Sequence, residues 1–211
     1  SEEDTEYAPR FEAGAQACGI EIEKLTPQEA LRLEPALNPK LLLAYTVPDG
    51  SFDPLRLALA FAATAKKHGS EFRPYHEVEG MLFDGQGNVK GGKVWDRTSG
   101  KHYDRYADIV VNATGAWAGQ VANFANASVP VKPTPGVMVA YDQRLMQRVV
   151  NRLCEPDDGD IIIPQRRMMV IGTTSFEVQD VDYIPVREDQ MEQMHRCASA
   201  LVPGLKRAKM R

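Results

Sequence analysis

Short apolar stretches alternate along this chain with turn and capping signals, and their spacing predicts helices separated by short strands. The longest helical pattern covers 55–67, begins after the N-cap pair Asp53-Pro54 and ends at Gly69. Thr26 starts another helix, because Pro27 suits the first helical position and Glu29 completes a capping box. Further helices are predicted over residues 7–18 and 187–201.

The region between 77 and 106 predicts an antiparallel meander. Its three strands, 77–83, 89–95 and 101–106, are separated by turns rich in Gly, Asp and Ser. The proline-rich stretch 129–136 follows and predicts a crossover between domains. Other apolar strands are predicted over residues 20–22, 137–141, 160–163 and 168–172.

The stretch ADIVVNATGAWAG, residues 107–119, carries the strongest candidate chemistry. The run Ile109 to Val111 predicts a buried strand of a mostly parallel sheet, ended by Asn112 to Gly115. Ligands bind at this end of strands in open α/β sheets, and glycine lets backbone approach a ligand closely. Any strand-to-helix turn favours small residues, however, so the residues alone leave a cofactor-binding turn and an ordinary connection both open.

Composition restricts the function classes. The 211 residues, 43% of them hydrophobic, can form one large core or two small ones. A net charge of −4 without long like-charged blocks argues against a basic nucleic-acid-binding stripe. No apolar run approaches the roughly 18 residues of a membrane span, and the acidic amino terminus is unlike a signal peptide.

The metal-ligating and anion-binding side chains give weaker signals. Three widely spaced cysteines without a CxxC pair fit a reducing compartment and argue against a disulfide framework or a zinc site. Glu192 and His195 could share a helix face, but no second such pair completes a metal site. The hydroxyls of 173–175 and the pair Arg166-Arg167 could bind an anion; an ordinary hydroxyl turn and a solvated hairpin tip are the alternatives.

Four motifs stand in one order at compatible spacings: VPDGSFDP (47–54), ADIVVNATGAW (107–117), DIIIP (160–164) and VIGTTS (170–175). Together they resemble the FAD-dependent glycerol-3-phosphate dehydrogenases, within the D-amino-acid-oxidase-like flavoproteins. LEPALNPKL and DQRLMQRVVNR make the chain most similar to the large A subunit of the anaerobic type. The resemblance covers nearly the whole chain.

This resemblance implies a mixed α/β fold with two interleaved parts. Residues 54–130, with the meander and the ATG strand, would belong to an FAD-binding domain of the glutathione-reductase type. Residues 1–53 and 131–211 would build a mixed-sheet substrate domain.

The resemblance also implies site residues. The backbone of Val78 would meet the adenine, and Ala113, Thr114 and Gly115 would lie beside the adenosine and pyrophosphate. Trp117 matches the aromatic residue after that turn. On the substrate side, Thr173 and Thr174 match the family's GTT turn, while Arg166 and Arg167 are expected at the substrate phosphate from their charge and location.

The implied activity is the oxidation of sn-glycerol 3-phosphate to dihydroxyacetone phosphate, with electrons passed through FAD to a quinone or electron-transfer subunits. The implied location is cytoplasmic, with peripheral association at the inner face of the membrane through those partners. Two alternatives remain: a related oxidase acting on an amino acid or amine, and a non-catalytic module of this fold.

The chain departs from the family in two ways. Pro135 and Val137 stand where relatives often carry the lysine and serine of a Lys-Gly-Ser sequence, and no GxGxxG loop is present. We therefore expect an internal segment of a longer protein. By itself this segment is expected neither to hold FAD tightly nor to turn over, because the pyrophosphate would lack its glycine-rich loop.

Overall fold

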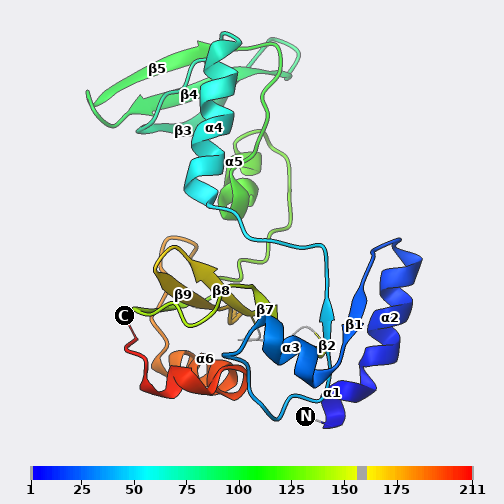
Figure 1. The fold of residues 1–211 in the computed structure, drawn as a ribbon. Helices are drawn as coiled ribbons and strands as arrows, with labels where there is room; N and C mark the ends of the chain where they lie inside the picture. The colour runs from blue at the N-terminus through cyan, green and yellow to red at the C-terminus, as the bar shows by residue number, and fades with distance from the viewer. Residues whose placement is uncertain (1, 156–160, 211) are drawn as a thin grey trace. The chain divides into compact units, whose positions relative to one another are not determined.

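The computed structural model describes residues 2–155 and 161–210, which fall into two compact units. Unit 1 consists of Ser1–Phe52, Thr134–Glu177 and Ile184–Arg211, and unit 2 of Asp53–Pro133 and Val178–Tyr183. Figure 1 shows that both units mix helices with antiparallel strands. The predicted mixed α/β class is confirmed, and the chain passes between units within the proline-rich stretch, at Pro133 and Thr134.

Unit 1 is built on a four-stranded antiparallel sheet in the order β6-β9-β8-β7. Its strands are β6 (Val139–Tyr141), β7 (Val150–Asn151), β8 (Ile161–Gln165) and β9 (Met168–Gly172). Helix α6 (Glu188–Leu201) and the 3-10 helix η2 (Pro203–Arg207) pack beside this sheet, as Figure 1 shows. The core between them consists of fully buried residues: Val139, Tyr141, Met146, Ile162, Met169, Ile171, Met194, Ala198, Val202 and Leu205.

The amino-terminal part of unit 1 carries short elements. They are α1 (Glu2–Glu6), α2 (Ala8–Ala17), β1 (Glu23–Leu25), α3 (Pro27–Leu33) and β2 (Ala44–Thr46). The capping box of α3 is confirmed, with Thr26 and Glu29 bonded to each other's backbone N–H. After α3, the buried Glu34 carboxylate accepts the backbone N–H groups of Gln147 and Arg148, at 2.8 and 3.1 Å. This carboxylate fastens the end of α3 to the segment before β7.

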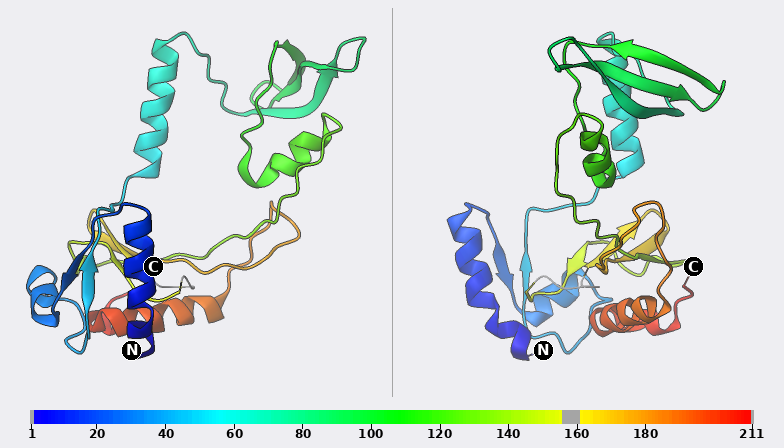
Figure 2. Two further views of the ribbon diagram at one scale, coloured as in Figure 1. Left: turned by 90° about the vertical axis from the view of Figure 1, so that its right-hand side faces the viewer. Right: turned by 180° about the vertical axis from the view of Figure 1, so that it is seen from behind.

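Unit 2 contains the three-stranded meander β3 (His76–Phe83), β4 (Val89–Asp96) and β5 (Lys101–Tyr106), seen from two further sides in Figure 2. Helix α4 (Pro54–Lys67) precedes the meander, and Asp53 caps it by accepting the N–H of Arg56. Both the helix and the meander agree with the predictions. None of the residues of α4 is buried, although the helix is rich in Leu and Ala.

The predicted buried strand at Ile109 to Val111 is wrong for this structure. Residues 107–114 form no strand, and the side chains of Ile109 and Val111 are 80% and 81% exposed. A strand exists only when its backbone groups pair with a neighbour. The N–H of Ala107 donates to the carbonyl of Lys90 at 2.9 Å, but within residues 2–155 and 161–210 the stretch 108–114 belongs to no sheet. The mostly parallel sheet expected around it is absent from the same residues, where every strand pairing is antiparallel.

A smaller difference between a predicted and an observed strand has the same cause. The strand predicted at 20–22 lies three residues later, at β1, because β1 pairs with β2, which the hydrophobic pattern did not predict. Strand β8 begins at Ile161, and the predicted start at Asp160 lies outside the described residues. In residues 2–155 and 161–210 no helix combines the length and the apolar character needed to cross a membrane.

Candidate functional site

The turn of unit 2 that begins at Asn112 is held in shape by the side chain of that residue. The Asn112 amide donates to the carbonyl of Ala118 at 2.9 Å, and its oxygen accepts both the hydroxyl and the N–H of Thr114, at 2.7 and 3.3 Å. These three bonds join the two ends of the predicted cofactor-binding turn. The turn is therefore shaped without help from a regular strand before it.

Gly115 leaves the surface of this turn open. Its φ is +57°, which favours glycine, and a Cβ placed there would meet nothing within 4 Å. A 3-10 helix, η1 (Gly115–Trp117), begins here and continues into α5 (Ala118–Asn123). Free approach to backbone followed by the start of a helix is an arrangement that suits an anionic ligand.

Trp117 is oriented by a residue distant in sequence. Its indole N–H donates to the carboxylate of Asp182 at 3.0 Å, and Asp182 belongs to the short segment Val178–Tyr183 that returns to unit 2. The indole ring remains partly exposed. The chain thus holds an aromatic face beside the Gly115 turn.

Val78 lies on β3, opposite Val94 of β4, and β3 is an edge strand of the meander in the part of the chain that the structure describes. Along an edge strand, alternate backbone N–H and C=O groups face away from the partner strand. Such groups can bind the hydrogen-bonding edge of a purine. The bulge between Val78 and Gly80 changes the twist of β3 at this point.

These features of unit 2 fit an adenosine and pyrophosphate. An edge strand offers backbone donors and acceptors, the Gly115 turn offers a surface without side chains, and Trp117 offers an apolar face. Ala113 and Thr114 lie within the same turn, whose shape Asn112 controls. The residues present can therefore hold part of an FAD molecule.

In unit 1, the side chain of Thr174 connects neighbouring segments of the fold. This side chain is fully buried; its hydroxyl donates to Gln190 Oε1 at 2.9 Å and accepts the N–H of Val137 at 3.1 Å. Thr174 thereby connects the end of β9 to α6 and to the segment that leads into β6. Thr173, which is exposed, donates to the carbonyls of Val137 and Thr174 at 3.4 and 3.1 Å.

Gly136 packs directly against this threonine pair. A Cβ at Gly136 would lie 2.1 Å from Thr173 Oγ1 and 2.4 Å from the Thr174 carbonyl oxygen. The site where relatives often carry Lys-Gly-Ser therefore does contact the GTT turn, with Pro135 and Val137 on either side of the glycine. Glycine is the residue that this close approach permits.

Arg166 and Arg167 lie at the other end of the same hairpin. They form the exposed turn between β8 and β9, where Gln165 pairs with Met168, whereas Thr173 follows the opposite end at Gly172. Arg166 has a φ of +53°, and its carbonyl accepts from the Arg144 guanidinium at 2.9 Å. Four residues of strand span about 13 Å, so the structure does not bring the arginine pair and the threonine pair to one phosphate.

Three supporting residues escaped the sequence reasoning: Asn112, Asp182 and Gln190. Asn112 carried a signal, since a short amide side chain at the start of a turn commonly bonds the backbone two residues on. Asp182 and Gln190 carried none, because their partners lie 65 and 16 residues away. In the described part of the chain, no cluster of three or more His, Cys, Asp or Glu side chains could hold a metal ion.

Comparison with known proteins places these features in context. The family model of the FAD-dependent oxidoreductases of the DAO type matches residues 1–211. The A1 subunit of the anaerobic glycerol-3-phosphate dehydrogenase of Haloferax volcanii is 39% identical over 97% of this chain, and the A subunit of the Escherichia coli enzyme is 33% identical over 99%. The chain spans 36% and 39% of their lengths.

Among solved structures, glycine oxidase from Geobacillus kaustophilus is similar, with a TM-score of 0.79 and 28% identity. The superposition covers all of this chain and 54% of the oxidase. The resemblance read from the four motifs is thereby confirmed, and so is the fold class.

Proposed function

Because this chain belongs to the family of FAD-dependent oxidoreductases, we propose that its protein oxidises sn-glycerol 3-phosphate to dihydroxyacetone phosphate. The observation that carries this proposal is the identity of 33–39%, over nearly the whole chain, to the A1 and A subunits of two anaerobic glycerol-3-phosphate dehydrogenases. The chain spans little more than a third of those relatives, so the activity is proposed for the whole protein.

When bound, FAD would supply the redox chemistry, accepting a hydride from C2 of the substrate and passing two electrons to a quinone. The residues of this chain would bind and orient. The turn at Thr114 and Gly115 and the open edge of β3 would hold the adenosine and pyrophosphate. A guanidinium of the Arg166-Arg167 turn would bind the substrate phosphate through charge-assisted hydrogen bonds.

These assignments give the two units different roles. We assign residues 54–130 to the FAD-binding side, because Val78 and the Asn112–Trp117 turn belong to unit 2. Residues 1–53 and 131–211 are assigned to the substrate side, which carries Thr173 and the arginine turn. Thr174 would act there by positioning Thr173, since both bonds of its hydroxyl are made within the protein.

Partners and location belong to the same proposal. Both curated relatives are named as subunits, which supports assembly with further subunits. We propose that these subunits transfer electrons from FAD to a quinone. We propose a cytoplasmic protein held at the inner face of the membrane through those partners. The three widely spaced cysteines, none of them in a CxxC pair, agree with a reducing compartment.

Oxidation of an amino acid or amine is the second candidate. It is favoured by the structural similarity to glycine oxidase and by Pro135 and Val137, which replace the lysine and serine common in glycerol-3-phosphate dehydrogenases. The full-length protein should be assayed with glycerol 3-phosphate, glycine and D-amino acids, using an artificial dye as electron acceptor. We expect the protein to oxidise glycerol 3-phosphate and none of the amino acids. Turnover of the amines alone would contradict the proposal, and a flavin-free protein inactive on all of them would indicate a non-catalytic module.

The cofactor site is tested by a matched pair of glycine variants. Gly115 and Gly100 have φ of +57° and +71°, and a Cβ at either would meet nothing within 4 Å. Gly115→Ala and Gly100→Ala therefore carry similar backbone strain, about 1 kcal/mol. We expect only Gly115→Ala to lower the FAD affinity of the full-length protein, by about tenfold, as measured by flavin retained after dialysis. Equal retention in both variants would remove Gly115 from the site.

The isolated 211 residues should not retain FAD, because their sequence carries no GxGxxG loop to bind the pyrophosphate. The measurement is the visible spectrum of the purified chain. Stoichiometric flavin absorbance near ~450 nm would show that the loop is dispensable for binding.

A further inference from the structure

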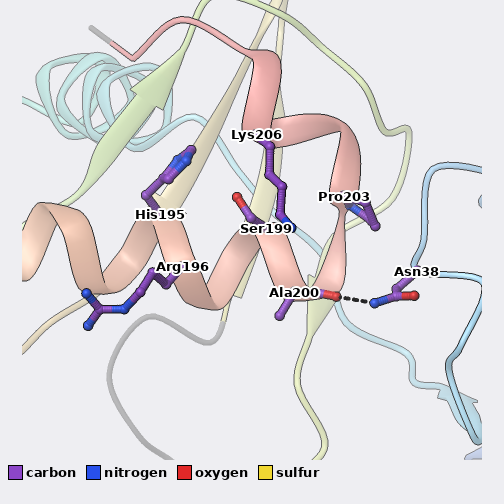
Figure 3. A pocket seen from close by; sticks show the side chains of 7 residues that line it. All are labelled: Asn38, His195, Arg196, Ser199, Ala200, Pro203 and Lys206. Atoms are coloured by element: carbon purple, nitrogen blue, oxygen red, sulfur yellow. Dashed lines mark hydrogen bonds between the residues drawn. The ribbon is translucent and has the colours of Figure 1, made fainter.

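A cavity of about 500 Å³ lies in unit 1, between the carboxyl-terminal half of α6, η2 and Asn38. Cavities of this size commonly bind small molecules. Figure 3 shows its lining side chains: His195, Ser199 and Lys206 lie on one side of α6, and Arg196 points away from them. None of the lining residues belongs to the candidate FAD or substrate site.

The polar side chains around this cavity are mainly hydrogen-bond donors. Lys206, Arg196 and His195 line it, and no carboxylate does. The amide nitrogen of Asn38 is already bonded to the carbonyl of Ala200 at 2.8 Å, as the dashed line in Figure 3 marks. A cavity lined in this way favours an anion over a cation or a neutral molecule.

The Ser199 hydroxyl is the strongest evidence for a ligand in this cavity. The Ser199 side chain is only 5% exposed, and its hydroxyl is the one buried side-chain polar atom of residues 2–155 and 161–210 without a hydrogen-bond partner. Buried hydroxyls in native proteins are nearly always paired, so this hydroxyl is the buried group among the lining residues with hydrogen-bonding capacity left for a ligand. The hydroxyl can rotate to donate to whatever fills the space.

A hydrogen bond to Tyr141 orients the imidazole ring of His195. Its Nδ1 lies 2.5 Å from the hydroxyl of Tyr141, a fully buried residue of the core. Burial raises the pKa of Tyr141 to about 12, so the phenol keeps its proton at neutral pH and can donate it to Nδ1. Nε2 is the ring nitrogen of His195 that Tyr141 does not engage, and it is the one left to donate to a ligand.

We propose that this cavity binds a small phosphate-bearing molecule, whose phosphate is held by Lys206, His195 and the Ser199 hydroxyl. A phosphate offers these three donors three strong acceptor oxygens and close to two negative charges, whereas a carboxylate offers two oxygens and one charge. Arg196 also lines the cavity and adds positive charge, although its side chain points away from these three groups. Phosphate by itself fills only part of the volume, which leaves room for a small organic group.

The test is calorimetric titration of the full-length protein with inorganic phosphate at constant ionic strength. Lys206→Met should weaken phosphate binding by about tenfold, the effect of losing one charge-assisted hydrogen bond. Arg207→Met is the matched control, because Arg207 is the neighbouring exposed cation of η2 and does not line the cavity. It should change the affinity less than about twofold if binding is local.

Ser199→Ala separates ligand binding from packing. It should weaken phosphate binding about threefold or more while leaving thermal stability without phosphate unchanged or raised, since it removes an unpaired buried hydroxyl. Titration of Arg167→Met distinguishes this cavity from the proposed substrate site, and it should leave the Lys206-dependent component intact. The proposal is overturned if wild-type binding is not saturable, if Arg207→Met and Lys206→Met weaken it equally, or if acetate binds as tightly as phosphate.

Discussion

Unit 1 encloses more of its apolar side chains completely than unit 2 does, although both are built from similar short elements. Ten residues of the unit 1 core are at most 1% exposed. In unit 2 the most buried hydrophobic residues, Met81, Leu82, Val94 and Ala122, are 7–9% exposed. Along α4, Leu55, Leu59 and Phe61 are each at least 60% exposed.

This difference in burial distinguishes the local signals that define an element from the tertiary contacts that bury it. Capping and turn residues define where elements begin and end, and they act within a few positions of the chain. Burial requires a second surface, and most helical stability in proteins comes from such packing. Helix α4 is rich in Leu and Ala, and the apolar face of such a helix normally packs against a second surface. Unit 2 therefore has well-defined elements but only a few buried apolar residues of its own.

The largest effect should come from truncating the core of unit 1. Ile171→Ala removes a fully buried side chain between the sheet and α6 and should cost about 2–5 kcal/mol of unfolding free energy. Leu59→Ala on α4 removes an aliphatic side chain of the same size that is 60% exposed, and it should cost less than about 0.5 kcal/mol. Urea unfolding followed by far-ultraviolet circular dichroism measures both. Equal costs would mean that α4 is covered in solution.

A smaller effect is expected at the buried carboxylate of unit 1. Glu34→Ala leaves the N–H groups of Gln147 and Arg148 without their acceptor and should cost about 1–3 kcal/mol. Glu34→Gln keeps an acceptor oxygen and serves as the control, with a smaller loss. If the two variants are equally stable in urea unfolding, the two backbone bonds contribute nothing.

The smallest effect concerns pH and the turn between β4 and β5 in unit 2. The hydroxyl and backbone donors of Ser99 and Thr98 hold the pKa of Asp96 well below its usual range. A carboxyl whose pKa is lowered by folding stabilises the folded state above its unfolded pKa of about 3.9, and this stabilisation is lost as pH falls toward the folded pKa.

Asp96→Asn should therefore lower stability at pH 7 and flatten its decline below about pH 4. The readout is the urea midpoint as a function of pH, followed by the fluorescence of Trp95 and Trp117, which both belong to unit 2. Glu77→Gln is an exposed carboxyl control on β3. Parallel pH profiles for wild type and Asp96→Asn would contradict the assignment.

Local signals predicted the elements of both units well. The Thr26 capping box, the Asp53 cap of α4 and the three strands of the meander are confirmed, since each depends on residues within one turn or one hairpin. The prediction of a strand at Ile109 to Val111 was wrong, because an apolar run forms a strand only when neighbouring strands pair with it. The candidate site divides in the same way: the Gly115 turn could be read from the sequence, whereas the bond from Trp117 to Asp182 could not.

The sequence by itself determined the starts of α3 and α4, the meander and the family, because caps, turns and ordered motifs are properties of neighbouring residues. Only the tertiary structure decided which apolar residues are buried. It separated the Arg166-Arg167 turn from Thr173 along one hairpin, and it left the Ser199 hydroxyl unpaired beside a cavity. These outcomes depend on contacts between segments far apart in the chain, and no local pattern encodes them.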